Sequence, residues 1–363
     1  MNRTDYHHPV VKNTREILDP VDQQIVAALH GAGRDSWENV AARTSCSAST
    51  ARRRFEALSD AGLVRVIGAT DVSRLGIGTP VILRFRGVPG EVESFMAALG
   101  QRSDVRFLTA VAGSADCVAE LVVPEMGDFV QLMTQLVDGT SITTESFVVT
   151  HTYRSGQDWL PRHDEAPDRA GQAGGQQDAA GRDLPSPVTI SRVEAGVLSH
   201  LMTDGRIPVG VLAGAVGCSE RAAAGAIESL RAKELLDFRV LVEPEFLGYR
   251  AECFVWLDVV PGALQETAAR LAAHPGTKYL SATTGRFGLV GQVALPGIAD
   301  IHDYTTTVLG ALPGVRSVDV TLQVATAKRV WTRVIDGAYA APEGPIGVVA
   351  ALGDGAARRD RER

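Results

Sequence analysis

The sequence predicts an α+β protein that contains two copies of one unit. Each copy is expected to be a winged helix-turn-helix followed by a ferredoxin-like βαββαβ sandwich. Two observations lead to this prediction. The chain of 363 residues agrees with itself at a fixed offset of 172 positions. Within each copy, the apolar residues first follow a helical period and then alternate as in strands.

The repeat is visible when the sequence is shifted by 172 positions without a gap. Gly33-Arg34 then falls on Gly205-Arg206, and Val88-Pro89-Gly90 falls on Val260-Pro261-Gly262. Many of the agreeing residues are glycine and proline, which turns select for their backbone geometry. Chance agreement over some 110 residues is very improbable. The sequence therefore predicts a tandem duplication.

Three helices are predicted at the start of the first copy. Asp19 is a good N-cap with Pro20 after it, Ser36 can cap a short second helix, and Ser47 can cap a third. The following stretch, "LVRVIGATDVSRLG", predicts a β-ribbon. Three helices with a short turn before the third, followed by such a wing, are typical of a winged helix-turn-helix.

The period changes after this ribbon. "TPVILRFRGV" predicts a strand, "EVESFMAALGQRS" a helix, and "VRFLTAVAGSADCVAELVVP" two strands joined at a glycine turn. "MGDFVQLMTQLVD" predicts a second helix and "ITTESFVVTHTY" a last strand. This order is βαββαβ, a ferredoxin-like α/β sandwich, and the second copy repeats it.

Composition and pattern divide the chain into six segments. We expect an N-terminal winged helix-turn-helix at 18–76, a first sandwich at 79–154, a flexible linker at 155–187, a second and less basic helix-turn-helix at 190–248, a second sandwich at 251–334 and a disordered tail at 335–363. The linker is rich in Gly, Pro, Asp, Gln and Ala and shows no apolar period.

Bulk composition excludes several classes of protein. A net charge of −7 argues against a generally basic coat for nucleic acid, although it says little about a local patch. The chain shows neither an apolar run long enough to span a membrane nor a signal-peptide core, so we expect a cytoplasmic protein without a membrane partner. Its four cysteines lie far apart, and no catalytic set, metal site or cofactor is predicted.

The third predicted helix carries the residues that indicate DNA binding. If Ala51, Phe55 and Leu58 face the core, Arg52 and Arg53 project from the opposite side. A major-groove helix places its base- and phosphate-contacting groups there. The candidate DNA-binding residues are Ser47, Ser49, Thr50, Arg52, Arg53 and Arg54. The alternative is a solvated arginine-rich face.

The same helix of the second copy has lost these cations. Ala224-Gly225-Ala226 stands where the first copy has its three arginines, and Arg221 at the helix start is the cation nearest to them. Residues 19–75 hold seven arginines against seven carboxylates, whereas residues 191–247 hold six cations against eight carboxylates. Fewer cations mean less counterion release. We therefore expect a weakened or mainly structural second module.

In this order of elements, the chain resembles the Lrp/AsnC (leucine-responsive, feast/famine) transcription regulators, fused in tandem. The resemblance rests on "LDPVDQQIVAAL", on "SASTARRRFEAL", on Leu75-Gly76 after the wing and on "LPGV" at 312–315. It implies that double-stranded DNA binds to the first part and that the sandwiches dimerise and sense an amino acid or a related small carboxylate. We expect an internal pseudo-dimer of sandwiches that associates further into homo-oligomers.

The resemblance also indicates an effector site. The family's G-D-x-D turn corresponds to Gly113, Ser114 and Asp116 in "GSAD", and its counterpart contains Gly285 and Arg286. Amides freed by a glycine turn can hold a carboxylate, Asp116 can meet an ammonium group, and Arg286 can pair with a carboxylate. Because neither copy keeps the full motif, two ordinary hairpin turns are the alternative.

Two rival functions stay open. Sirohaem decarboxylases share this architecture and carry a His-x-Tyr-x-Arg type segment on a sandwich strand. The matching strands of this chain contain no histidine, so that segment has no counterpart here. The other rival is an assembly partner that tunes related regulators without reading DNA. The arginines of the first copy argue against it, and the loss of cations in the second copy argues for it.

Overall fold

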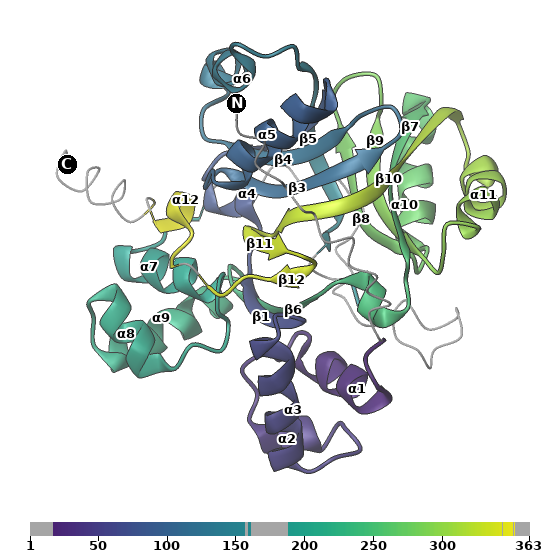
Figure 1. The fold of residues 1–363 in the computed structure, drawn as a ribbon. Coiled ribbons are helices and arrows are strands. Elements are labelled where there is room, and N and C mark those ends of the chain that lie inside the picture. Colours follow the sequence, from purple (N-terminus) through teal and green to yellow (C-terminus); the bar gives the residue numbers. More distant parts are fainter. Residues whose placement is uncertain (1–16, 157–158, 161–187, 343, 351, 353–363) are drawn as a thin grey trace, which may run out of the picture.

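The computed structural model describes residues 17–156, 159–160, 188–342, 344–350 and 352 (Figure 1). The first half contains α1 (Pro20–Leu29), α2 (Trp37–Ala41), α3 (Ala48–Asp60), β1 (Val64–Ala69), α4 (Val72–Leu75), β2 (Thr79–Arg86), α5 (Pro89–Gly100), β3 (Val105–Ala112), β4 (Cys117–Val123), α6 (Phe129–Val137) and β5 (Thr143–Arg154). The second half contains α7 (Arg192–Leu201), α8 (Val209–Val216), α9 (Glu220–Ala232), β6 (Asp237–Val242), β7 (Ala251–Val259), α10 (Leu264–Ala273), β8 (Thr277–Thr283), β9 (Leu289–Leu295), α11 (Asp300–Asp303), β10 (Val315–Arg329), β11 (Thr332–Ile335), β12 (Ala338–Tyr339) and α12 (Gly347–Ala350).

The first three helices begin at the predicted caps. The side chains of Asp19, Ser36 and Ser47 each accept a hydrogen bond from the backbone N–H three residues further on. Such bonds satisfy amides that a helix leaves unpaired at its start. The prediction of a three-helix module at the front of a mixed α/β chain is confirmed.

The wing differs from the predicted ribbon. Only Val64–Ala69 forms a strand, β1, and the short helix α4 follows it in place of a returning strand. β1 pairs instead with β6, antiparallel, from Val64 opposite Val242 to Ala69 opposite Asp237. The two helix-turn-helix modules are therefore joined by a two-stranded ribbon to which each contributes one strand.

Eight strands form one closed sheet. Their order is β3-β4-β2-β5 in the first half and β8-β9-β7-β10 in the second; β5 pairs with β8, and β10 pairs with both β7 and β3. The sequence analysis predicted an internal pseudo-dimer of two sandwiches, and the structure joins their two four-stranded sheets edge to edge. The physical reason is that each four-stranded sheet leaves two edges of unpaired backbone groups, which here satisfy one another.

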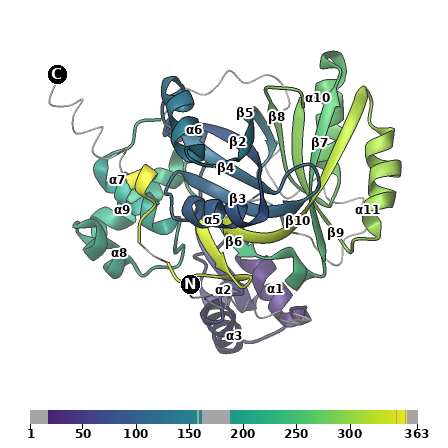
Figure 2. The same ribbon diagram turned by 45° about the horizontal axis from the view of Figure 1, so that its top comes forward.

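Helices cover the outside of this barrel, and aromatic side chains fill the inside. Helices α5 and α6 lie against the first half, and α10 and α11 lie against the second (Figure 2). The buried interior cluster includes Phe107, Phe147, Phe254, Trp256 and Phe287. A further apolar core is shared by both helix-turn-helix modules. The barrel is thus a packed unit and the two modules are another.

The expected disordered tail is wrong for the described residues after 334. Tyr339 in β12 is buried, its N–H donates to the Gly62 carbonyl at 2.7 Å, and its hydroxyl donates to Glu243 at 2.5 Å. Residues 353–363 of the predicted tail lie outside the described part.

Most of the predicted linker also lies outside the described part. Trp159 within it is described: its side chain is buried and donates to the Pro275 carbonyl at 3.0 Å.

Three general expectations can be compared with the described residues. All four cysteines are free thiols, and Cys117 and Cys253 are buried. Among the described helices, none has the length and apolar character needed to cross a membrane. Nor does the described part of the chain bring three His, Cys, Asp or Glu side chains together in a way that would hold a metal ion.

Candidate nucleic-acid interface and effector site

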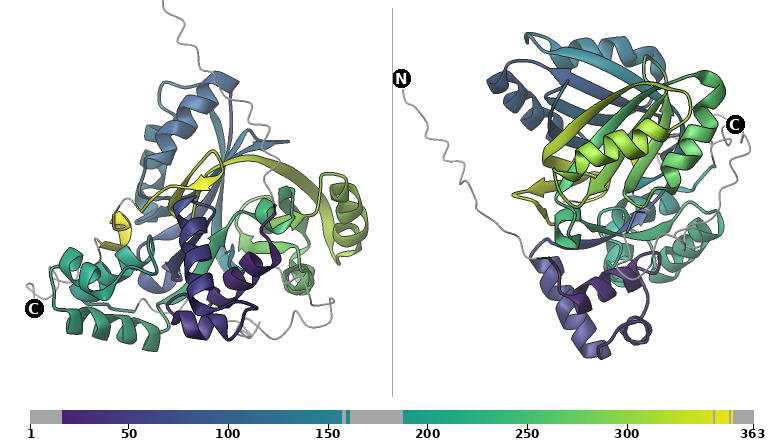
Figure 3. Two further views of the ribbon diagram at one scale, coloured as in Figure 1. Left: turned by 60° about the horizontal axis from the view of Figure 1, so that its bottom comes forward. Right: turned by 90° about the vertical axis from the view of Figure 1, so that its right-hand side faces the viewer.

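Helix α3 lies on the protruding first module (Figure 3). Its buried side chains are Ala51, Phe55 and Leu58, as the helical period predicted. The start of the helix gathers three hydroxyl groups. The Ser47 Oγ accepts from the Thr50 N–H at 3.2 Å and lies 3.1 Å from the Ser49 Oγ and 3.0 Å from the Thr50 Oγ1. These groups surround a helix N-terminus, a site at which backbone amides favour phosphate.

Arg52 and Arg53 are both exposed on the outward face of α3. The Arg52 Nε donates to the Glu56 Oε1 at 2.8 Å, one helical turn further on, with both side chains more than half exposed. Arg53 makes no ion pair with any residue that the structure describes. Exposed pairs of this kind hold only weakly, so both guanidinium groups are available to an anionic partner.

Arg54 does not belong to this outward set, which corrects the prediction. Its Nη1 lies 2.5 Å from the Asp19 Oδ2 and 3.0 Å from the Asp22 Oδ1. These carboxylates stand at the start of α1, where the helix dipole also favours negative charge. Arg54 therefore ties α3 to α1, and the side chain is occupied within the module.

The second module presents a different surface. Ser219 caps α9 as Ser47 caps α3, but exposed Ala224 and Gly225 occupy the positions of Arg52 and Arg53. Arg221 is exposed at the helix start, and Ala226 is buried. The two modules thus share a backbone arrangement and differ in the charge that they present.

The two glycine turns each touch the opposite half of the barrel. Gly113 has φ of +149°, and a Cβ there would lie 2.6 Å from the Thr321 Cγ2 on β10. Gly285 has φ of +91°, and its Cβ would lie 3.3 Å from the Phe147 Cδ1 on β5. Glycine is required at such positive φ and close approach. Both turns therefore belong to the junction between the halves.

One buried arginine connects these turns, and the sequence analysis missed it. The side chain of Arg84 on β2 is 2% exposed, and its Nη2 donates to the Ser114 Oγ and, at 2.8 Å, to the Asp319 Oδ2. Its Nε lies 3.6 Å from the Glu145 Oε2, and the Arg286 Nη2 lies 3.5 Å from the Glu145 Oε1. Ser114 and Arg286 are thus linked through Arg84 and Glu145.

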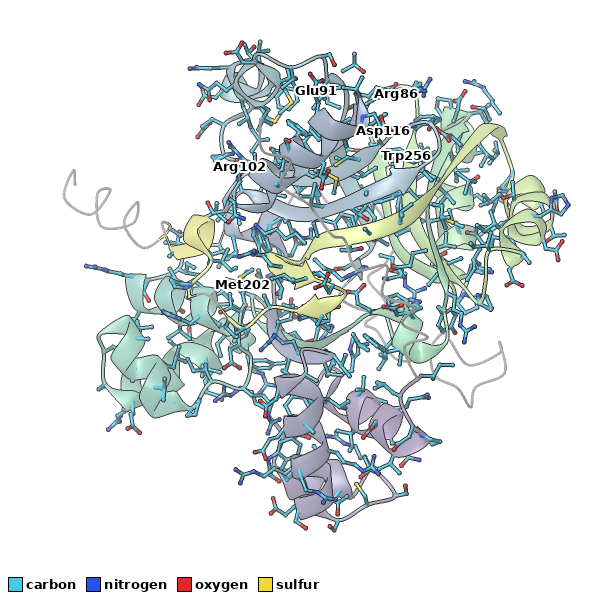
Figure 4. The ribbon with its side chains drawn as sticks, viewed as in Figure 1. Arg86, Glu91, Arg102, Asp116, Met202 and Trp256 are labelled. Atoms are coloured by element: carbon cyan, nitrogen blue, oxygen red, sulfur yellow. The ribbon has the colours of Figure 1, made fainter. Side chains whose placement is uncertain are left out.

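Asp116 lies at the same end of the barrel but is used differently (Figure 4). Its Oδ2 accepts a hydrogen bond from the Gly87 N–H at 3.0 Å. The structure therefore brings Ser114 and Arg286 together with Arg84, while the carboxylate of Asp116 holds the backbone beyond β2. The predicted contact between Asp116 and an ammonium group has no support in this geometry.

The interior of the barrel contains a second cluster of buried charges. Arg329 donates to Glu243 at 2.9 Å through both Nε and Nη2, and to Glu252 at 2.9 Å, while Lys278 donates to Glu252 at 2.5 Å. Burial and the nearby Arg329 lower the pKa of Lys278 to about 8. A cavity of about 50 Å³ adjoins this cluster. Each of these ions has a partner of opposite charge. Because Glu252, Lys278 and Arg329 stand on β7, β8 and β10, their ion pairs join these three strands.

Two parts of the chain match known domain families, and several regulators resemble it in sequence. Residues 252–330 match the family model described as the Lrp/AsnC ligand binding domain, and residues 17–67 match a helix-turn-helix domain. The chain is 24% identical over 142 residues to the HTH-type transcriptional regulator FL11 of Pyrococcus horikoshii, covering 39% of this chain and 93% of that protein. An uncharacterized HTH-type transcriptional regulator of Pyrococcus furiosus is 22% identical over 146 residues, covering 40% of this chain and 99% of that protein.

Among solved structures, the sirohaem decarboxylase NirDL has a similar fold. The TM-score is 0.57 at 13% sequence identity, over 93% of this chain and 99% of that one. At this identity the likeness concerns the fold. Residues 252–330 thus resemble the Lrp/AsnC ligand binding domain, residues 17–67 resemble a helix-turn-helix domain, and the relatives similar in sequence are named as transcriptional regulators.

Proposed function

We propose that the protein is a DNA-binding transcriptional regulator built from a tandem fusion of two Lrp/AsnC-type units, and that α3 of the first module reads the DNA. The observation that carries this proposal is the outward face of α3, where Arg52 and Arg53 stand exposed beside the hydroxyl-rich helix start. Arginine makes bidentate contacts with guanine and holds phosphate. The fused sandwiches form the internal pseudo-dimer, and further association gives homo-oligomers.

Selection of bound duplexes from a random pool by the full-length protein tests this function. We expect recovery of a defined sequence and a steep loss of affinity with salt, since phosphate contacts release counterions. Recovery of no preferred sequence, together with an affinity that does not respond to salt, would refute the proposal. The assembly-partner alternative predicts that second outcome and requires that the protein bind related regulators instead.

We further propose that a small carboxylate effector, such as an amino acid, binds where the two glycine turns meet. Arg84 supports this proposal, because its Nη1 is buried without a hydrogen-bond partner among the described residues and its Nε meets only the Glu145 carboxylate, at 3.6 Å. A buried guanidinium with unused donors favours a carboxylate. Titration of the full chain with amino acids and oxo-acids, followed by melting temperature and DNA affinity, tests it. No shift in either quantity would rule the site out.

The sirohaem decarboxylase alternative rests on the likeness of fold, and the interior of the barrel argues against it. The cavity there is about 50 Å³, whereas small-molecule pockets begin at roughly 300 Å³. None of the described residues that line it is a histidine. We propose a regulator without enzymatic activity that acts in the cytoplasm on double-stranded DNA. Incubation with sirohaem should leave no tetrapyrrole absorbance on the purified protein, and decarboxylated product would contradict this.

A further inference from the structure

Two arginines cross between the helix-turn-helix modules. Arg34 of the first module donates through Nη1 to the carbonyls of Gly205 at 2.9 Å and Ile207 at 3.0 Å. Arg206 of the second donates through Nη1 to the Gly33 carbonyl at 2.5 Å and through Nη2 to the Asp35 carbonyl at 3.2 Å. The two arginines are equivalent residues, 172 positions apart. Each module therefore holds the loop of the other.

Close backbone contacts fix this exchange. A Cβ at Gly33 would lie 2.5 Å from the Val66 Cγ1 and 2.8 Å from the Phe238 Cβ, so only glycine fits there. The Gly31 N–H donates to the Phe238 carbonyl at 2.9 Å, beside the ribbon of β1 and β6. With an apolar core that is also shared, these contacts make the two modules one packed unit.

The exchange is not symmetric in what each arginine touches next. The guanidinium of Arg206 lies 4.3 Å from the ring centroid of Trp37 and 5.8 Å from that of Phe55. The rings of Trp37 and Phe55 are themselves 5.6 Å apart. Phe55 is on α3, two residues after Arg53. Position 209, which is equivalent to Trp37, is a valine, so Arg34 meets no corresponding ring.

We infer that the second helix-turn-helix module serves as a positioning domain for the first, and that Arg206 is the residue through which it acts. This inference rests on the proposed function and adds a role for the module whose third helix, α9, lacks the outward arginines of α3. Arg206 lies on the inner side of the recognition helix α3, against the Trp37 ring that packs on Phe55. Arg53 faces outward on the same helix. Base contacts demand placement within about 0.5 Å, which requires such support from behind.

The test compares three full-length variants for affinity to a selected duplex at several salt concentrations. Arg206→Met removes two carbonyl hydrogen bonds and the ring contacts. Arg34→Met is the matched control, since it removes the same charge and two equivalent hydrogen bonds but no ring contact. Trp37→Leu removes the ring and leaves the hydrogen bonds of Arg206, and it decides the case if Arg206→Met fails to fold.

We expect Arg206→Met and Trp37→Leu to weaken binding about tenfold with an unchanged salt slope, because no phosphate contact is lost. Arg34→Met should lower the melting temperature similarly and change affinity much less. Equal loss of affinity in Arg34→Met and Arg206→Met, or no loss in Arg206→Met and Trp37→Leu, would overturn the inference. Wild-type protein that selects no sequence would instead refute the proposed function.

Discussion

The guanidinium of Arg84 lies 4.6 Å from the ring centroid of Trp256, and these two residues are 172 positions apart in the chain. In an assembly of two identical chains, the same position would carry two arginines or two tryptophans. This single chain places one of each where the halves of the barrel meet. The pair is therefore an asymmetric contact that a homodimer of either half cannot form.

Arg84→Met should abolish carboxylate binding at this end of the barrel, because it removes the buried guanidinium and keeps an unbranched side chain against Trp256. The measurement is the shift in melting temperature on titration with the carboxylate that stabilises the wild-type protein most. Arg316→Gln is the control, since Arg316 is exposed and pairs with Asp258 at 3.5 Å rather than with Asp319 or Glu145, the carboxylates that contact Arg84. A shift that persists in Arg84→Met would contradict the site.

Glu194 gives the second module a dependence on pH. Burial raises its pKa, but hydrogen bonds from the Lys233 ammonium, the Ser191 N–H and the Ser229 hydroxyl outweigh burial and lower the pKa to about 2. Because this value is below the ordinary 4.5, the ionised carboxylate stabilises the fold above pH 4.5. That stabilisation should be lost as pH falls from 4.5 towards 2.

Glu194→Gln should therefore lower the free energy of unfolding by about 2 kcal/mol at pH 7 and by progressively less below pH 4.5. Urea unfolding of both proteins between pH 3 and 7 provides the measurement. A difference between them that does not change across this range would show that the charge of Glu194 is not what stabilises the module.

The chain after residue 334 should contribute to stability. Tyr339 is 3% exposed and joins the Gly62 carbonyl of the first module to Glu243 at the end of β6. Tyr339→Ala should cost about 3–5 kcal/mol, the range for deleting a buried aromatic side chain. Denaturant unfolding measures this. Tyr339→Phe, which keeps the ring and loses the hydroxyl, should cost less, and equal costs would contradict the packing role.

Substitution of Arg54 should affect the stability of the fold, whereas substitution of Arg52 should affect DNA binding. Arg54→Met removes the ties to Asp19 and Asp22 and should lower the melting temperature without changing the salt slope of DNA binding. Arg52→Ala should leave the melting temperature nearly unchanged and reduce the salt slope by about one unit, if Arg52 meets phosphate. The reverse pattern would mean that Arg54 is the DNA-facing residue.

Local features of this chain were predictable from sequence, and long-range ones were not. Ser47 and Asp19 predicted helix starts because a cap involves only the next three residues. The closure of the barrel depends on pairing between β5 and β8, whose contacts the pattern of either strand does not specify. For the same reason the sequence predicted a self-contained wing, although β1 pairs with a strand more than 160 residues away.

The candidate sites show the same division. The outward position of Arg53 follows from the helical period, whereas Arg54 was misplaced because its partners lie on another helix. Arg84 was missed since the strand that carries it reads as apolar, and nothing in that strand alone indicates a buried cation. The signal was present in the repeat, where an arginine falls on a tryptophan at the offset of 172.

The proposed asymmetry between the two modules, in which the first reads DNA and the second does not, can be tested directly. The measurement is the affinity of Arg53→Ala and of Arg221→Ala, in the full-length chain, for a selected duplex and for random duplex at several salt concentrations. Arg53→Ala should cost about 1–3 kcal/mol on the selected duplex and relax the preference at one base pair, while Arg221→Ala should change little. If Arg221→Ala weakens selective binding as much as Arg53→Ala, both modules read DNA and the assigned asymmetry is wrong.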